Sequence, residues 1–544
     1  MEPLIVIVLG LLVIAATAVI APRVGVAAPL LLVLTGIGVS VLPVVPPVHV
    51  EPEWVLAGVL PPLLYSAAVS MPAMDFRREF RAISGLSVVL VVASSLVIGW
   101  FATLLVPGLP FAWGVALGAV VSPTDAVATS IVRRLGVSPR VVAVLDGEGL
   151  LNDATALVVL RTAIAGAAAS VSLGGVLGDF LFAVLVAGLI GFVVGHVDLA
   201  VRGRVRDATV NTVLSFTAPF LASVPAEQLG ASGLVAAVMA GVVTGYDGPR
   251  RLPPQHRLSD AQNWRTVELV LEGAVFLVTG LQLATVVADV RADHGGTGTA
   301  VALAAGALVI SVVVRAAYVA PLVAGLRRRA RRAADRRDRV LVIQDRLRDP
   351  ESAATAFDRP GARARRARVP STGQLERMRV RVRRLVADID YFLAAPLGWR
   401  DGAVVVWAGM RGAVTVAAAQ TLPEDTPSRP LLVLTAFLVA ISSLLLQGGT
   451  LPRLVRAVGA AGARPADGTD DRAAVADLLE SAAATVPDRT DPDRPLAVVR
   501  AQRLALLDAR DDGTHSSAAL AAALAVLDAE QISLELRSAG GAAG

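Results

Sequence analysis

The chain has 544 residues, 55% of them hydrophobic, and its mean hydropathy is +0.65. It has no cysteine, which excludes a disulfide framework, and its five histidines form no cluster with the spacing of a zinc or iron site. The formal net charge is +5 and the chain contains no lysine. The arginines flank apolar segments, where membrane orientation explains them better than nucleic-acid binding does.

Apolar segments of about twenty residues recur along the chain, and this length matches the thickness of a bilayer core. The first segment lacks a basic leader and a small-residue cleavage site, so we expect a retained helix rather than a signal peptide. We predict an all-α polytopic membrane protein with about thirteen transmembrane helices. Their expected positions are 3–20, 25–43, 54–71, 85–106, 110–132, 141–162, 175–197, 208–224, 228–246, 266–288, 299–325, 400–422 and 429–451.

The charges of the predicted loops alternate from one side of the membrane to the other. One side carries clusters of arginine, whereas Arg291 and Arg429 are the clear arginines of the opposite side. The positive-inside rule makes the arginine-rich side cytoplasmic, with the N-terminus outside and the C-terminus inside a bacterial inner membrane. The clusters are Arg23; Arg77, Arg78 and Arg81; Arg133, Arg134 and Arg140; Arg202, Arg204 and Arg206; and Arg250, Arg251 and Arg257.

Two polar segments accompany the apolar ones. The first is an arginine-rich cytoplasmic insertion, for which a solvated helical connector is favoured over a surface for anionic lipid or for regulation. The second is a cytosolic helical tail, in which two helical patterns, Ala473–Ala484 and Leu496–Leu536, predict a hairpin. The expected divisions are helices 1–11 at 1–325, the insertion at 326–399, helices 12 and 13 at 400–455, and the tail at 456–544.

Ionisable residues at bilayer depth are functional candidates, because each costs about 2.5–3.5 kcal/mol to insert unless it is paired or faces water. In the fifth span, Pro123 removes a backbone donor and opposes a regular helix. The hydroxyls of Ser122 and Thr124 could then face an ion, as in the broken helices of many transporters. A simple proline kink, with Asp125 capping the second half, is a plainer interpretation that is compatible with a site.

The sixth span holds three acids and an amide within eight residues. Asp146 and Asp153 are seven residues apart and share one helical face, whereas Glu148 and Asn152 are four apart and share an adjacent face. Carboxylates are hard oxygen ligands for a cation such as sodium, and burial favours their protonated form. One aspartate could thus bind a proton or a cation but not both, which is an exchange mechanism. A structural salt bridge is a credible alternative for Glu148 but a poor one for Asp153.

Later spans add further charges. Glu268 and Glu272 lie four residues apart in the tenth span and share a face. Arg315 lies in the eleventh span and Arg411 in the twelfth, and a buried arginine stays protonated and must find an anion. We expect Glu148 to pair with Arg315, and one glutamate of the tenth span to pair with Arg411.

These motifs together resemble the monovalent cation–proton antiporter family, which includes bacterial sodium/proton antiporters and animal sodium/proton exchangers. SPTDAVATS is similar to the Thr-Asp-Pro stretch of the family's fifth helix, and GEGLLNDATALVV to the Gly-Glu-Ser-Leu-Leu-Asn-Asp stretch of its sixth. LEGAVFLVTGLQL and MRGAVTVAAAQTLP resemble two later signatures, and the four follow in the family's order within residues 3–455.

The resemblance implies two inverted six-helix repeats, a dimerisation domain that makes a homodimer, and a moving core domain. It also implies that the fifth and twelfth helices are interrupted and cross near the ion site. By the family pattern, Asp153 binds the cation and the proton, Asn152 marks electroneutral exchange, and sodium contacts Asp153 and Thr124. Thr124 and Asp125 line the crossing, and Glu148 is held by an arginine.

The chain departs from the family pattern at three positions. Ala126 replaces a frequent proline, and Gly149 replaces a serine that offers a hydroxyl ligand. Ser66 stands where some relatives carry a glutamate in the third helix. The last two differences leave the preferred cation open among sodium, lithium and potassium.

We therefore predict a secondary active antiporter that exchanges a monovalent cation for protons in pH homeostasis. It is expected to be no enzyme, to hold no cofactor, and to have the bilayer, the transported ions and a second copy as partners. A cation channel or uncoupled transporter is one alternative, although the chain has no repeated filter stretch. A non-transporting membrane sensor is another, although we find no signalling domain.

Overall fold

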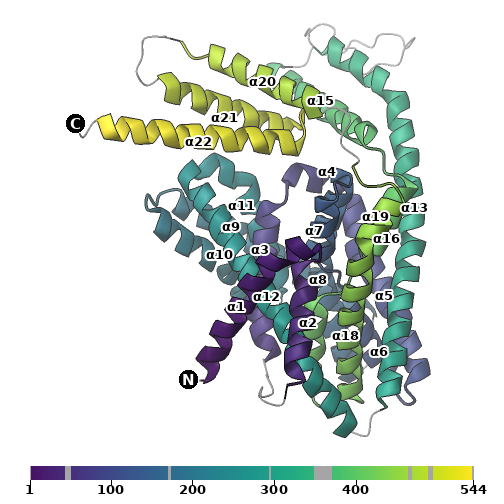
Figure 1. Ribbon diagram of the computed structural model, residues 1–544. Helices are drawn as coiled ribbons and strands as arrows, with labels where there is room; N and C mark the ends of the chain where they lie inside the picture. The colour runs from purple at the N-terminus through teal and green to yellow at the C-terminus, as the bar shows by residue number, and fades with distance from the viewer. Residues whose placement is uncertain are drawn as a thin grey trace. The chain divides into compact units, whose positions relative to one another are not determined.

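The computed structural model describes residues 2–42, 51–168, 173–292, 296–347, 371–462, 468–487 and 494–541. Every regular element in these residues is a helix, which confirms the predicted all-α class (Figure 1). The chain forms two compact units. The first comprises Met1–Ala320 with Trp399–Ala463, and the second Pro321–Gly398 with Arg464–Gly544.

The first unit contains the long apolar helices. The elements up to α8 are α1 (Glu2–Val24), α2 (Ala28–Ser40), the π-helical η1 (Trp54–Val59), α3 (Leu60–Ser70), α4 (Ala73–Ser84), the π-helical η2 (Gly85–Val89), α5 (Leu90–Leu105), α6 (Phe111–Val121), α7 (Val127–Arg134) and α8 (Pro139–Ala168). The elements that follow are α9 (Leu173–Arg202), α10 (Ala208–Gln228), α11 (Gly233–Arg251), α12 (Pro254–Ala292), α13 (Thr297–Arg346), α16 (Trp399–Trp407), α17 (Ala413–Gln420), α18 (Arg429–Ser443), the π-helical η3 (Leu444–Gly448) and α19 (Gly449–Ala457).

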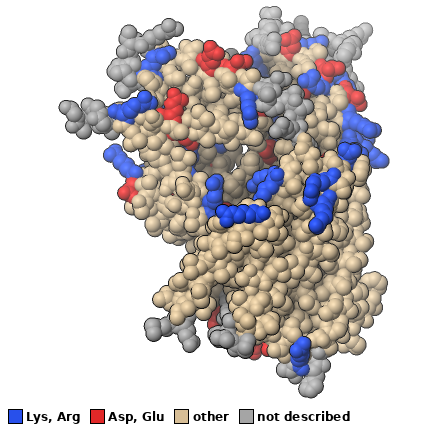
Figure 2. All heavy atoms as spheres, viewed as in Figure 1, with Lys and Arg blue, Asp and Glu red and all other residues tan. Residues whose placement is uncertain are grey.

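Each predicted span falls on one of these helices or on consecutive helical segments, and the spans 110–132 and 400–422 each fall on two helices with a break between them. Among the described residues, eight helices are long and apolar enough to cross a membrane, and one of these, α22, belongs to the second unit. On the face seen in Figure 2, the surface of the first unit is mostly uncharged. Large apolar side chains such as Leu9, Leu185 and Val309 are exposed on the helices of this unit, as expected for lipid contact.

The helices of the first unit pack in two groups. The α12 group contains α1, α2, α3 and α9–α12, whereas the α8 group contains α4–α8, α13 and α16–α19. The α8 group is built around a large apolar core that includes Leu117, Leu303 and Phe437. In the α12 group, α2 and α12 approach closely at Gly36 and Gly280. A Cβ on Gly36 would stand 2.5 Å from a backbone oxygen of α12, so small residues are needed there.

Local signals explain several helix ends. Asp207 precedes α10, and its carboxylate accepts a hydrogen bond from the N–H of Val210 at 2.9 Å. This bond stabilises the charged carboxylate and lowers the pKa of Asp207. Ser232 caps α11 in the same way through the N–H of Val235.

The second unit is also helical. It contains the end of α13, α15 (Thr372–Ala394), α20 (Gly468–Ala484), α21 (Arg494–Asp512) and α22 (Ser517–Gly541). The tail was predicted as a two-helix hairpin, but the structure has three helices, which pack side by side around Val499 and Leu527 (Figure 1). The second pattern divides because Gly513, with φ of +71°, follows the end of α21. Residues 348–370 of the predicted insertion lie outside the described residues.

Candidate functional site

Two helix breaks meet inside the α8 group. The first separates α6 from α7 at residues 122–126, and the second separates α16 from α17 at residues 408–412. Pro123 accounts for the first break, because proline has no N–H to continue a helix. The backbone N–H of Asp125 donates to the carbonyl oxygen of Met410 at 2.8 Å, so the two broken helices are joined at their interruptions.

Two glycines make this close approach possible. A Cβ on Gly412 would stand 1.4 Å from Oδ2 of Asp125. A Cβ on Gly409 would stand 2.7 Å from Cδ of Arg315. Both distances are far below van der Waals contact, so any larger residue would have to separate the second break from its neighbours.

The side chain of Arg411 stabilises the first break. It is buried, and its Nη1 donates to the carbonyl oxygens of Ser122 and Pro123, the second at 3.2 Å. These carbonyls are free because α6 ends there. The expected ion pair between Arg411 and a glutamate of α12 is wrong for the described residues, since the guanidinium donates to backbone oxygens instead.

A chain of polar contacts connects α13, α8 and the first break. The guanidinium of Arg315 binds both carboxylate oxygens of Glu148, with 2.7 Å between Nη2 and Oε2, and its Nε donates to the carbonyl of Val405. Both side chains are buried, so the expected Glu148–Arg315 pair is formed. Thr124 donates to Oε1 of Glu148 at 3.3 Å, and Nδ2 of Asn152 donates to Oγ1 of Thr124 at 2.5 Å.

Asp153 follows Asn152 on α8 but has a different environment. Its side chain is 6% exposed, and Oδ1 has no hydrogen-bond partner among the residues that the structure describes. Within the same part of the chain, Oδ1 of Asn152 also has none. A buried polar atom left without a partner costs about 1–3 kcal/mol. The carboxylate oxygen could take up a proton or contact a cation, whereas the amide oxygen could accept a hydrogen bond or contact a cation.

Asp125 and Ser122 lie at the first break but bond in different directions. Oδ1 of Asp125 accepts a hydrogen bond from the N–H of Val127 at 2.8 Å, so this aspartate caps α7. The hydroxyl of Ser122 donates to the carbonyl of Gly118 at 2.8 Å and thus turns back onto α6. Asp125 is therefore a helix cap, as the plainer interpretation of the sequence suggests. Ser122 contributes to the junction through its carbonyl oxygen, which accepts a hydrogen bond from Arg411.

Asp146 lies away from this junction. It forms an ion pair of 2.7 Å with Arg133, whose side chain is largely exposed. Seven residues of α-helix separate Asp146 from Asp153, which corresponds to about 10 Å along the axis. Asp146 thus joins α8 to the end of α7 near the molecular surface.

The two glutamates of α12 face other groups. Oε1 of Glu268 accepts a hydrogen bond from Oγ of Ser66 on α3 at 2.5 Å. Glu272 forms no hydrogen bond or ion pair with a described residue, and the charges that act on it are those of Asp125, Glu268 and Arg134. Glu272 therefore belongs to the surroundings of the first break.

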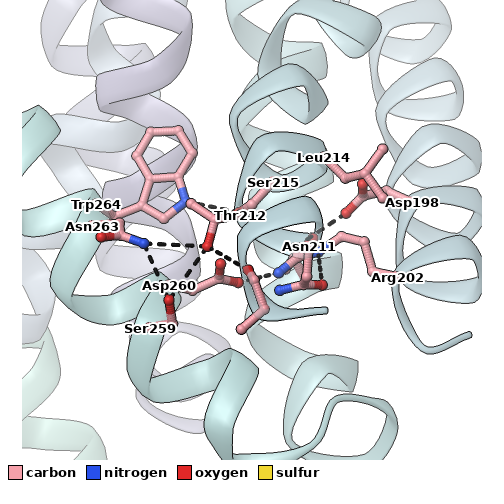
Figure 3. A network of polar contacts seen from close by, with 12 residues as sticks. Asp198, Arg202, Asn211, Thr212, Leu214, Ser215, Ser259, Asp260, Asn263 and Trp264 are labelled. Carbon is pink, nitrogen blue, oxygen red and sulfur yellow. Dashed lines mark hydrogen bonds and ion pairs between the residues drawn. The ribbon is translucent and has the colours of Figure 1, made fainter. Parts of the chain in front are cut away.

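Sequence reasoning missed a buried charged network between α9, α10 and α12 (Figure 3). Arg202 is fully buried and donates to Asp198 at 3.3 Å, to Asp260, and to Oδ1 of Asn211 at 3.0 Å. Nε1 of Trp264 donates to a neighbouring serine at 2.9 Å. The loop-charge pattern places Arg202 in a loop, although its spacing of four from Asp198 is the signal of a helical ion pair. The further members are Thr212, Ser215, Ser259 and Asn263.

A second buried ion pair was missed in the α8 group. Nε of Arg140 lies 2.6 Å from Oε1 of Glu79, and the two side chains are 3% and 1% exposed. The pair joins α4 to the beginning of α8. The sequence indicates Arg140 only as a loop charge, and no local pattern predicts a partner 61 residues earlier.

Comparison with known proteins decides the family. The model of the transmembrane sodium/hydrogen exchanger family matches residues 8–343 and 382–457, which is most of the chain. The chain belongs to the sodium/hydrogen exchanger family. It is therefore a multi-pass membrane protein of a family of transporters rather than of enzymes.

Curated exchangers and antiporters are similar over different lengths. An uncharacterized Na(+)/H(+) exchanger of Mycobacterium tuberculosis (strain ATCC 25618 / H37Rv) is 28% identical over 440 residues, or 79% of this chain and 69% of the relative. An uncharacterized Na(+)/H(+) exchanger of Escherichia coli (strain K12) is 38% identical over 246 residues, which cover 43% of this chain and 45% of the relative. A sodium, potassium, lithium and rubidium/H(+) antiporter of Bacillus subtilis (strain 168) is 30% identical over 241 residues, which cover 43% of this chain and 36% of the relative.

A solved structure shares the fold. The sodium proton antiporter MjNhaP1 from Methanocaldococcus jannaschii aligns with a TM-score of 0.56 at 15% sequence identity. The alignment covers 84% of this exchanger-family chain and 99% of that structure.

Proposed function

We propose that the protein is an electroneutral antiporter that exchanges sodium for protons by alternating access, with Asp153 as the shared site. Lithium and potassium are further candidate cations, since the similar protein of Bacillus subtilis is a sodium, potassium, lithium and rubidium/H(+) antiporter. Membership of the sodium/hydrogen exchanger family supports this class of function.

The compensation of charge around α8 supports Asp153 as the site. Glu148, five residues earlier, is neutralised by Arg315 and held by three hydrogen bonds from side chains. Asp153 is equally deep in the bundle but has no such cation beside it among the described residues. A charge without a partner at this depth is strongly disfavoured. A bound cation or a bound proton would each make Asp153 neutral, and only one of them fits at a time.

The neighbours of Asp153 can contribute oxygen ligands and position the site. We assign Oδ1 of Asn152 and Oγ1 of Thr124 as candidate ligands of the cation, next to the carboxylate of Asp153. Asp125 holds the start of α7, and Arg411 keeps the carbonyls of the break in place. Glu148 and Arg315 then fix Thr124 from the other side.

Exchange requires that the loaded site faces each side in turn. We propose that the α8 group carries Asp153 past the α12 group, and that this movement is favourable only when the carboxylate is neutral. In the bacterial plasma membrane, the arginine-rich loops would face the cytoplasm and the N-terminus would lie outside. The protein would act as a homodimer in pH homeostasis.

The change of Asp153→Asn tests this proposal directly. Asparagine has nearly the same shape but carries no charge and takes up no proton, so exchange should fall to the level of protein-free vesicles. The measurement is sodium-driven proton movement in proteoliposomes, followed with a pH-sensitive dye inside the vesicles. Sodium-driven exchange that survives Asp153→Asn would overturn the assignment.

A control variant and two electrical measurements distinguish electroneutral exchange from a channel. Asp289→Asn removes an exposed carboxylate from α12 and should leave exchange unchanged. An imposed potassium-diffusion potential should not alter the rate of an electroneutral exchanger. Sodium conductance in a planar bilayer without a proton gradient would instead indicate a channel.

A further inference from the structure

The second break interrupts one particular hydrogen bond of the twelfth span. In an uninterrupted α-helix, the N–H of Arg411 would donate to the carbonyl oxygen of Trp407, four residues earlier. The break separates these two groups, because α16 ends at Trp407 and the N–H of Arg411 donates to a side chain of another helix. Arg411 is buried, so its N–H and the released carbonyl each need a new partner if the break is to persist.

Two side chains of the following span supply the missing partners. The N–H of Arg411 donates to Oγ of Ser443 at 2.9 Å, and Nε2 of Gln447 donates to the carbonyl oxygen of Trp407 at 3.3 Å. The hydroxyl of Ser443 in turn donates to Oε1 of Gln447. These three bonds, which we call the Ser443–Gln447 bridge, connect the N–H of Arg411 to the carbonyl of Trp407. The bridge therefore takes the place of the helical hydrogen bond that the break removes.

The helix that carries the bridge approaches the break closely. Ser443 is the last residue of α18, and Gln447 lies one turn later in the π-helical η3. The two side chains are 0% and 1% exposed, so water does not compete for their hydrogen bonds. A Cβ on Gly448 would stand 3.1 Å from Sδ of Met410, which is tighter than an ordinary van der Waals contact. The glycine thus lets η3 reach the backbone of the break.

Arg411 connects the bridge to the candidate cation site. Ser443 holds the backbone of Arg411, while the guanidinium of Arg411 donates to two carbonyl oxygens of the first break. The next residue of the first break is Thr124, a candidate ligand that accepts a hydrogen bond from Asn152. A displacement of Arg411 would therefore reach Thr124 through the carbonyls that Arg411 holds.

We propose that Ser443 and Gln447 are positioning residues of the cation site, which hold the second break open so that Arg411 keeps the first break in place. This inference rests on the proposed exchange at Asp153 and adds two residues that act through Arg411 rather than on the cation. Without the bridge, the N–H of Arg411 and the carbonyl of Trp407 either rejoin in a helical bond or stay without a partner. In both cases the backbone at Arg411 moves, and sodium affinity falls.

The first test is Ser443→Ala, with the sodium dependence of exchange measured in proteoliposomes. We expect the half-saturating sodium concentration to rise by about threefold to tenfold, as for the loss of one hydrogen bond. A smaller number of folded molecules lowers the maximal rate but not this concentration, so a merely structural role would leave it unchanged. Ser442→Ala is the matched control, because the exposed hydroxyl of Ser442 donates to Leu438 of its own helix, and it should keep the wild-type sodium dependence.

The second test asks whether the two side chains act as one bridge. Gln447→Met keeps the length of the side chain but removes its donor and acceptor, and should raise the half-saturating sodium concentration as Ser443→Ala does. The double variant Ser443→Ala/Gln447→Met should raise it by much less than the product of the two single changes. A full product would show that the residues act independently. Wild-type sodium dependence in either folded single variant would overturn the inference.

A binding measurement keeps this inference separate from the proposed function. Sodium that binds the folded state raises the unfolding temperature of detergent-purified protein as its concentration increases. This rise should need more sodium in Ser443→Ala than in the wild type, with choline chloride as the control for ionic strength. Wild-type protein that shows the rise but exchanges no protons would refute the antiport proposal alone. Equal sodium dependence of both unfolding temperatures would refute the positioning role, and no rise in the wild type would refute both.

Discussion

Glu148 and Asp153 lie five residues apart on α8 and have opposite electrostatic surroundings. Glu148 is bound by the buried guanidinium of Arg315, so its charge is part of the folded structure. Asp153 has a buried oxygen without a partner in the described residues. Their spacing could be predicted from the sequence, and so could the need of each acid for a partner. The Glu148–Arg315 pair was expected as well, whereas the absence of a partner for Oδ1 of Asp153 could be seen only in the structure, because it depends on which helices surround α8.

The Glu148–Arg315 pair should be essential to stability. Glu148→Gln or Arg315→Gln leaves one buried charge uncompensated, which typically costs about 3–5 kcal/mol. We therefore expect either single variant to unfold at a clearly lower temperature in detergent, as followed by tryptophan fluorescence. The double variant Glu148→Leu/Arg315→Met removes both charges and should lose less than the sum of the single variants. Strictly additive losses would show that the two charges are not coupled.

At the level of helices, the two breaks differ in how visible they are in the sequence. Pro123 predicts the first break, since it lies in an apolar span and has no N–H. The second break contains no proline, and the resemblance alone implied it. Its cause is tertiary: Gly409 and Gly412 admit Arg315 and Asp125 into space that a side chain would fill.

Gly412→Ala should separate the two breaks. The added Cβ would overlap Oδ2 of Asp125, so the hydrogen bond between Asp125 and Met410 would lengthen or break. We expect exchange to fall at least about tenfold, because a displacement of about 1 Å can cost a hundredfold in rate. Gly188→Ala on α9, where an added Cβ meets nothing within 4 Å, is the control and should retain exchange. Wild-type exchange rates in Gly412→Ala would show that the contact is dispensable.

At the level of the whole molecule, the loop charges predict which ends of the helices face the cytoplasm. The absence of cysteine makes this prediction easy to test, since each introduced thiol is unique. Arg204 follows α9 on the arginine-rich side, and Glu424 lies between α17 and α18 on the opposite side. Both side chains are exposed.

The orientation can be tested by applying a membrane-impermeant maleimide to intact cells that produce each single-cysteine variant. Glu424→Cys should react at once, whereas Arg204→Cys should react only after the membrane is permeabilised. Mass-tagged maleimide and a gel-shift assay suffice to read the labelling. The reverse pattern would invert the proposed orientation.

The sequence by itself determined the helical membrane class, the placement of the long apolar segments, the first break, and the acids of α8. These depend on local length, period and composition, which a chain carries before it folds. The tertiary structure decided which charges are neutralised, where the second break fits, and that Ser66 meets Glu268 across 202 residues. It also decided that Arg202 is buried with Asp198 and Asp260 rather than free in a loop. Such pairings depend on which helices pack together, and no local pattern contains that information.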